Sequence, residues 1–155
     1  MQNLFLTEED VFEIHIYVAE DEEGTLYCDL NIEGVNFLLG DRDGQIKGYT
    51  VKFKKPSFGD MMALTDMLFI TRDVGDGNTG FDVNPIAAKI KTMSFLIRDW
   101  SFTNSDGKKI PPTEENILNL NPLIATSISV QLEDYLRVKR EERVEYKEEI
   151  EKKIE

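Results

Sequence analysis

The chain has 155 residues, a length that suits one domain with a sizeable apolar core. Asp and Glu number 30 against 18 Lys and Arg, so the formal net charge is -12. A field of this sign repels phosphate backbones, and we therefore expect no nucleic acid partner. A basic or neutral protein partner is compatible with it, and so is a charge that serves only solubility.

Cys28 is the only cysteine and His15 the only histidine, which excludes an intramolecular disulfide, a thiolate zinc site and a two-histidine metal site. Cys28 lies in an apolar run and is predicted to be a small buried residue. The N-terminal residues lack the basic and apolar regions of a secretory signal. No run approaches the ~18 apolar residues of a membrane span. We expect a cytoplasmic protein with no membrane partner.

Residues 1–55 are rich in β-branched and aromatic residues that partly alternate with polar ones, which indicates strands. Turn signals at 20–24, 33–34 and 41–44 separate four predicted strands, which are 11–18, 25–32, 35–39 and 47–54. The pattern predicts a small antiparallel sheet, of uncertain register because the alternation is incomplete.

At Ser57 the apolar period changes from that of a strand to that of a helix. Ser57 is a candidate N-cap, with Asp60 three residues later in the position of a capping-box acid. The predicted helix ends near Thr71 and carries Met61, Leu64, Met67, Leu68 and Ile70. Its methionines are typical either of core filling or of an adaptable binding groove, and the first interpretation is favoured.

Residues 72–80 form the most glycine-rich segment of the chain. Counted from Asp73, the third and fifth positions are Gly75 and Gly77, which do not match a calcium loop, and the lysine of a phosphate loop is missing. We therefore predict a flexible loop between two helices.

From residue 84 to residue 136 the chain is predicted to be helical, with a connector around Trp100. Asn84 and Pro85 signal a helix start, and the apolar stripe that follows is Ile86, Ile90, Met93 and Ile97. Thr113 opens a second helix, and a third carries Ile124, Ile128, Leu132 and Leu136. Trp100 is either a core residue with a hydrogen-bonded indole or an interface anchor, and the core is favoured.

Beyond residue 136 the chain consists almost entirely of Glu, Lys and Arg, many of them paired at helical spacing. Such pairs predict that the preceding helix continues into solvent. A thin stripe at Tyr146, Ile150 and Ile154 would be able to dock on a partner. The predicted fold class is therefore α+β. One domain spans 1–136, strand-rich over 1–55 and helical over 56–136, and a charged helical tail spans 137–155.

No motif in the chain identifies a reaction. No nucleophile motif accompanies His15, and the spacing of the acidic residues selects no carboxylate pair. We predict that the protein is not an enzyme and has no catalytic residues, metal or cofactor.

Several short segments between residues 54 and 136 together form a distinctive pattern. They are Lys54–Pro56, Ile97–Phe102, Asp106–Pro112, Thr113–Ile117 and Leu120–Pro122. The pattern is a tryptophan, a polar turn with Asp-Gly, a proline, Thr-x-Glu-x-Ile, a break and a long helix, across about half of the chain. This pattern resembles small bacteriophage tail proteins of the tail assembly chaperone type. The resemblance implies a non-enzymatic adaptor that binds the tape-measure protein, the tail-tube protein or both during tail assembly, in the host cytoplasm if the chain is viral.

Two other classes remain open. One is a structural virion component such as a tail, neck or baseplate subunit, and the other is an α+β small-ligand-binding or enzymatic domain. A homo-oligomer is compatible with all three. The candidate partner-binding residues are apolar or aromatic ones of the helical half: Phe58, Met62, Trp100, Tyr135 and Tyr146.

Overall fold

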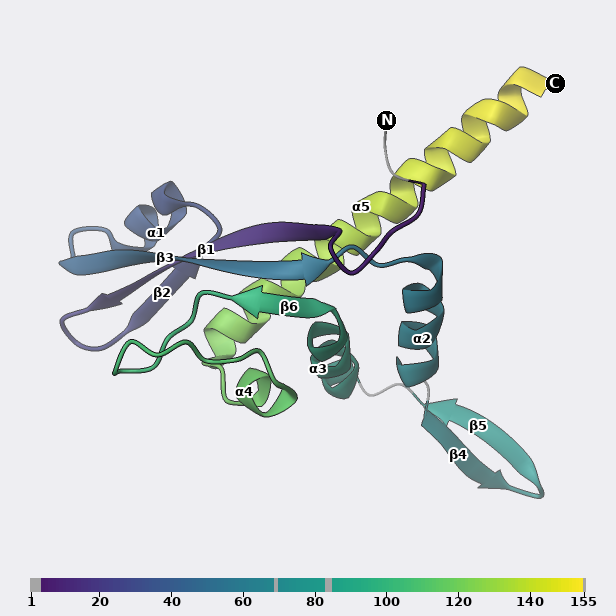
Figure 1. Ribbon diagram of the computed structural model, residues 1–155, viewed down its shortest axis with the longest axis horizontal. Helices are drawn as coiled ribbons and strands as arrows, with labels where there is room; N and C mark the ends of the chain where they lie inside the picture. The colour runs from purple at the N-terminus through teal and green to yellow at the C-terminus, as the bar shows by residue number, and fades with distance from the viewer. Residues whose placement is uncertain (1–3, 69, 83–84, 155) are drawn as a thin grey trace.

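The computed structural model describes residues 4–68, 70–82 and 85–154, with side chains at 4–67, 75–78, 85–137 and 152. It has the predicted α+β fold (Figure 1). The elements in chain order are β1 (Val11–Asp21), β2 (Leu26–Asp29), α1 (Ile32–Leu39), β3 (Gly44–Lys54), α2 (Phe58–Leu68), β4 (Ile70–Gly75), β5 (Asn78–Asp82), α3 (Pro85–Leu96), β6 (Ile97–Trp100), α4 (Glu114–Leu118) and α5 (Pro122–Ile154).

The main sheet is antiparallel, with strand order β2-β1-β3-β6. β1 and β3 pair along their whole length, so that Val11 lies opposite Lys54 at one end and Asp21 opposite Gly44 at the other. Side chains alternate between the two faces of a strand, and in β1 Ile14 and Ile16 are buried while the intervening His15 is exposed. The sheet therefore has one face on the core.

Helices α3, α4 and α5 contribute to the core with this face of the sheet, and α5 passes behind the sheet in Figure 1. The predicted stripe of α5 is confirmed, since Ile128 and Leu132 are buried and Ile124 and Leu136 are packed against the core. The other buried residues of this core are Ile14, Ile16, Val18, Val51, Phe53, Leu64, Met93, Leu96, Ile97, Trp100, Phe102 and Ile117.

The prediction of a strand at 35–39 was wrong, because this segment belongs to helix α1. The Asn31 side chain caps the helix by accepting a hydrogen bond from the Gly34 backbone N–H at 2.9 Å. Val35 and Leu39, four residues apart, are buried in a second, smaller core with Ala19. The helix also shortens the predicted strand 25–32, which ends at Asp29.

The prediction of a flexible loop at 72–80 was also wrong, because β4 and β5 form a hairpin there. Helix α2 ends at Leu68 rather than near Thr71. In the turn, Asp76 has a φ of 54° and Gly77 a φ of 73°. An Asp-Gly pair with both φ values positive is the preferred two-residue connection of a hairpin. The Asp76-Gly77 pair was therefore a better indicator of structure than the glycine content, which had suggested a flexible loop. In Figure 1 the hairpin projects from the rest of the fold.

Helix α3 ends at Leu96, so the predicted helical position of Ile97 was wrong. Ile97 begins β6, which pairs with β3 at the edge of the sheet. Ile97 and Trp100 are both buried in the core in this strand. The start of α3 at Pro85 is as predicted, whereas the proposed cap Asn84 lies outside the described residues.

The start of α4 and the course of α5 are confirmed. The Thr113 side chain accepts a hydrogen bond from the Asn116 backbone N–H at 3.2 Å, which makes it the predicted N-cap of α4. Helix α5 runs without a break from Pro122 to Ile154, so the charged run continues the preceding helix. Figure 1 shows that this part of α5 extends past the sheet.

Candidate functional site

Two of the candidate partner-binding residues, Phe58 and Met62, lie on one exposed face of α2. They are four residues apart and therefore neighbours along the helix surface. Phe58 is 81% exposed and Met62 is 56% exposed, while Leu64 on another face of the same helix is buried. We call Phe58 and Met62 the α2 patch. An apolar pair of this kind in contact with water is available for a partner.

Reciprocal hydrogen bonds fix the start of α2, next to the α2 patch. The Ser57 backbone N–H donates to the Asp60 carboxylate at 2.8 Å, and the Asp60 N–H donates to the Ser57 hydroxyl at 3.2 Å. This is the capping box that the sequence predicts, with Asp in the place of Glu. Phe58 is therefore presented from a fixed helix end.

An ion-pair network ties this helix end to the sheet. The buried Lys54 ammonium lies 2.5 Å from a Glu8 carboxylate oxygen and 3.1 Å from Asp60, and Arg98 on β6 lies 3.0 Å from Glu8. Hydrogen bonds from Lys54 and Arg98 lower the pKa of Glu8, and the bond to Glu8 is the largest cause that raises the pKa of Lys54. Burial alone would raise the pKa of Asp60, but hydrogen bonds from Ser57 and Lys54 lower it overall. Glu8, Lys54 and Asp60 are thus held charged at neutral pH, and α2 is anchored to β3.

Trp100 is a core residue and not a surface anchor. Its side chain is 2% exposed, its ring packs edge-on against Phe102 at 5.2 Å between centroids, and its indole N–H donates to the Ile110 carbonyl. The loop that brings Ile110 back has the predicted Asp106-Gly107 turn, with Gly107 at a φ of 76°. Of the two interpretations of Trp100, the structure places the side chain in the core.

Tyr135 serves to attach α5 to the sheet. Its ring stacks on Phe12 of β1 at 3.8 Å between centroids and 13° between planes, and Phe12 in turn stacks on Phe53. The side chain is half-buried as a result. The side chain of Tyr146 lies outside the described residues. The structure therefore brings only Phe58 and Met62 of the five candidates together on one surface.

Sequence reasoning missed an exposed apolar ridge on α1. Phe37 is 85% exposed, and the adjacent Leu38 is also exposed. We call these two residues the α1 ridge. Phe37 was overlooked because its segment was interpreted as a strand. The combination of Asn31 before the segment, and Val35 and Leu39 at helical spacing within it, is the signal that would have revealed the helix.

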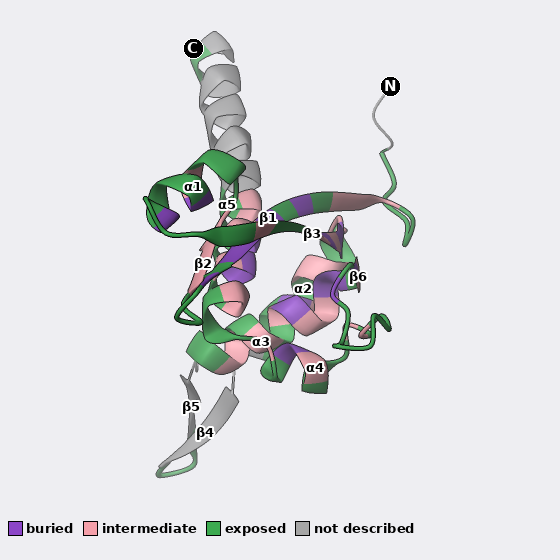
Figure 2. Cartoon of the chain, turned by 90° about the vertical axis from the view of Figure 1, so that its left-hand side faces the viewer, coloured by how far each residue is buried: buried purple, intermediate pink, exposed green. Residues whose placement is uncertain are grey.

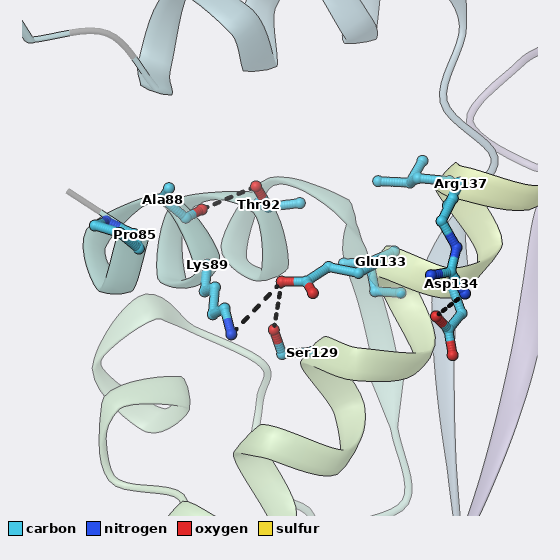
Figure 3. A pocket seen from close by; sticks show the side chains of 10 residues that line it. Pro85, Ala88, Lys89, Thr92, Ser129, Glu133, Asp134 and Arg137 are labelled. Atoms are coloured by element: carbon cyan, nitrogen blue, oxygen red, sulfur yellow. Dashed lines mark hydrogen bonds and ion pairs between the residues drawn. The ribbon is translucent and has the colours of Figure 1, made fainter. Parts of the chain in front are cut away.

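A cleft of about 520 Å³ lies between α3 and α5 (Figure 3). Its polar side chains are largely engaged with one another. Glu133 lies 3.7 Å from Lys89 and accepts a weak hydrogen bond from Ser129 at 3.5 Å. Asp134 pairs with Arg137 at 3.0 Å. The Lys89–Glu133 pair joins the two helices, whereas the other two contacts lie within α5.

The residues with reactive side chains lie apart from these surfaces. Cys28 is half-buried against the core, and burial raises the pKa of its thiol. His15 is exposed on the outer face of β1. Among the described residues, no group of three His, Cys, Asp or Glu side chains is placed to hold a metal ion. Every helix in the described ranges is too short or too polar to cross a lipid bilayer.

Comparison of the chain with protein-family models, with curated proteins and with solved structures gives no match.

Proposed function

We propose that this protein is a non-enzymatic adaptor of the phage tail assembly chaperone type. It would bind the tape-measure protein, the tail-tube protein or both while the tail is assembled. The observation that supports binding of a protein is the α2 patch, in which Phe58 and Met62 remain exposed on a helix anchored by the largely buried ion pair between Lys54 and Asp60. The assignment to tail assembly rests on the sequence resemblance over residues 54–136.

The chemistry of the α2 patch suits an apolar protein segment. Phenylalanine and methionine offer large apolar side chains, and methionine adapts its shape to different partners. A tape-measure protein is a long helical chain with apolar segments that are exposed before assembly. Covering such segments would keep them from aggregating, and the charge of -12 would keep the complex soluble.

The proposal is tested by co-expression of the chain with the tape-measure protein from the same genome. We expect that the wild-type chain raises the soluble fraction of the tape-measure protein and that the double variant Phe58→Ser/Met62→Ser does not. Leu118→Ser is a matched control, because Leu118 on α4 is 58% exposed, close to the value for Met62. The α2 patch would be excluded as the binding surface if all three chains gave the same soluble fraction of the tape-measure protein. It would also be excluded if Leu118→Ser lowered this fraction as much as the double variant does.

A structural virion subunit is the second candidate, and the β4–β5 hairpin is the feature that favours it. The hairpin projects from the fold in Figure 1, as an arm that contacts a neighbouring subunit would. Mass spectrometry of purified particles separates the two functions. A chaperone is missing from the mature particle, whereas a structural subunit is present in stoichiometric amount.

A further inference from the structure

In the α1 ridge, the Phe37 side chain points away from the rest of the protein, and Leu38 lies beside it at the edge of the buried face. Val35 and Leu39 face the small core, and Phe37 lies two positions from each, so its side chain projects from the opposite side of the helix. In Figure 2, α1 lies at the surface with buried residues only on one side. Phe37 is the most exposed residue of the helix among its large apolar side chains.

Both ends of α1 are held in place, so that the ridge is presented rigidly. The Asp29 carboxylate accepts hydrogen bonds from the backbone N–H groups of Leu30 and Asn31, at 2.6 and 3.2 Å. It lies against Gly34, where an added Cβ would be 2.3 Å from the Asp29 carboxyl carbon. At the other end, the Gly40 N–H donates to the Asn36 carbonyl at 3.0 Å. A rigid apolar side chain loses little conformational freedom when it binds.

The surroundings of the α1 ridge are strongly acidic. Six exposed carboxylates lie on α1, near the end of β1, in the β1–β2 turn or in the loop before β3, and among the described residues none of the six forms an ion pair. They are Glu20, Glu22, Glu23, Glu33, Asp41 and Asp43. The one basic residue of this region, Arg42, lies 4.0 Å from the buried Asp21 and 5.8 Å from the centre of the Tyr27 ring. The end of the sheet at which Phe37 is exposed therefore carries a local excess of negative charge.

The α1 ridge and the α2 patch lie at opposite ends of the sheet. Helix α1 packs where Asp21 pairs with Gly44, and α2 follows Lys54 at the far end of the same strands. At about 3.3 Å per residue, the eleven residues of β1 separate the two ends by roughly 35 Å. Figure 1 shows the two helices on opposite sides of the molecule. One protein segment bound at the α2 patch therefore leaves the α1 ridge free.

We propose that the α1 ridge is a second docking surface and that it binds a basic amphipathic helix of a protein partner. The apolar face of that helix would cover Phe37 and Leu38, and its Lys and Arg side chains would face the six carboxylates. Opposite charges around an apolar contact steer the partner and select against acidic competitors. The inference goes beyond the proposed function, because it does not require the α2 patch to be occupied. It makes the chain a bridge between two partners.

The test uses a fluorescently labelled synthetic amphipathic helix of about four turns, built from Leu and Lys. A second peptide with Glu in place of every Lys has the same apolar face and the opposite charge. Fluorescence anisotropy with the full chain measures both affinities. We expect the Leu/Lys peptide to bind at least about tenfold more tightly than the Leu/Glu peptide, with a difference that shrinks in high salt.

Single serine substitutions separate docking at the ridge from general attraction between opposite charges. Phe37→Ser leaves the charge unchanged and removes the apolar contact, so it should weaken binding of the Leu/Lys peptide about tenfold. Leu118→Ser is the matched control, since Leu118 on α4 is an exposed apolar residue outside both the α1 ridge and the α2 patch, and it should leave binding unchanged. Circular dichroism of each variant checks the fold.

Three results would overturn the inference. Equal binding of the two peptides would remove the role of charge, and equal affinities of wild type and Phe37→Ser would remove the role of the ridge. Light scattering that shows a wild-type dimer and a monomeric Phe37→Ser variant would mean that a second copy of the chain covers the ridge. Because none of these measurements involves the α2 patch or a tape-measure protein, their failure leaves the proposed function untouched.

Discussion

Replacing Trp100 by Phe tests the conclusion that this residue stabilises the core and does not contact a partner. The substitution removes the indole N–H that donates to the Ile110 carbonyl and leaves a smaller ring beside Phe102. A buried carbonyl that loses its donor costs about 1–3 kcal/mol. The void left by the smaller ring adds about 1 kcal/mol.

The expected loss for Trp100→Phe is therefore about 2–4 kcal/mol, which corresponds to a fall of roughly 5–15 °C in the midpoint of thermal unfolding. Far-UV circular dichroism during urea and thermal unfolding is the suitable assay, because the variant lacks the only tryptophan of the chain. Phe58→Leu, at an exposed position, is the control and should stay within about 0.5 kcal/mol of wild type. A loss for Trp100→Phe as small as that of the control would refute the assignment of Trp100 to the core.

Two further predictions concern the α1 end of the sheet. The pKa of Asp21 is lowered, first by the hydrogen bond from the Thr25 backbone N–H. The ionised carboxylate therefore stabilises the fold at pH values above its unfolded pKa of about 3.9. This stabilisation is lost as the pH falls through the lower pKa of the folded state. Asp21→Asn should therefore reduce the fall in urea midpoint at acid pH, and an unchanged pH profile would contradict this role. Gly34→Ala should lower the free energy of unfolding in urea by about 1–2 kcal/mol, because the new methyl group displaces Asp29 from its hydrogen bonds. Wild-type stability of this variant would show that Asp29 does not pack against Gly34.

Much of the fold could be predicted from local signals in the sequence. Alternation of apolar and polar residues located β1 and β3, and the Ser57–Asp60 box located the start of α2. The four-residue apolar spacing placed the buried face of α5. In each case the signal lies within the element that it predicts, so the prediction did not depend on a distant part of the chain.

The errors arose where tertiary contacts decide between two local structures. The segment around Val35 is apolar at both strand and helix spacing, and it is a helix because Ala19 and Leu39 complete a small core with it. Ile97 continues a helical stripe, but pairing with β3 draws it into a strand. A short apolar run does not by itself distinguish these outcomes.

The candidate site was predictable only in part for a related reason. Exposure depends on which face of a helix packs, and the sequence around Phe58 indicated that face only in part. Leu64 of the predicted stripe is buried, but Met67 of the same stripe is exposed. Trp100 and Tyr135 are also aromatic, but they pack inside the protein. Trp100 contacts Phe102 and Tyr135 contacts Phe12, and both partners lie outside the element of the residue they contact. The exposure of Phe37 could not be predicted, because it depends on the helix α1 and this segment had been interpreted as a strand.

The most direct test of the central claim is an affinity pull-down of the tape-measure protein with the tagged full chain, from cells that express both, quantified by mass spectrometry. The claim is that the chain binds this protein through the α2 patch. We predict that the wild-type chain and Leu118→Ser recover the tape-measure protein and that recovery falls about tenfold or more with Phe58→Ser/Met62→Ser. Undiminished recovery by the double variant would contradict the assigned surface, and no recovery by the wild-type chain would contradict the proposed function itself.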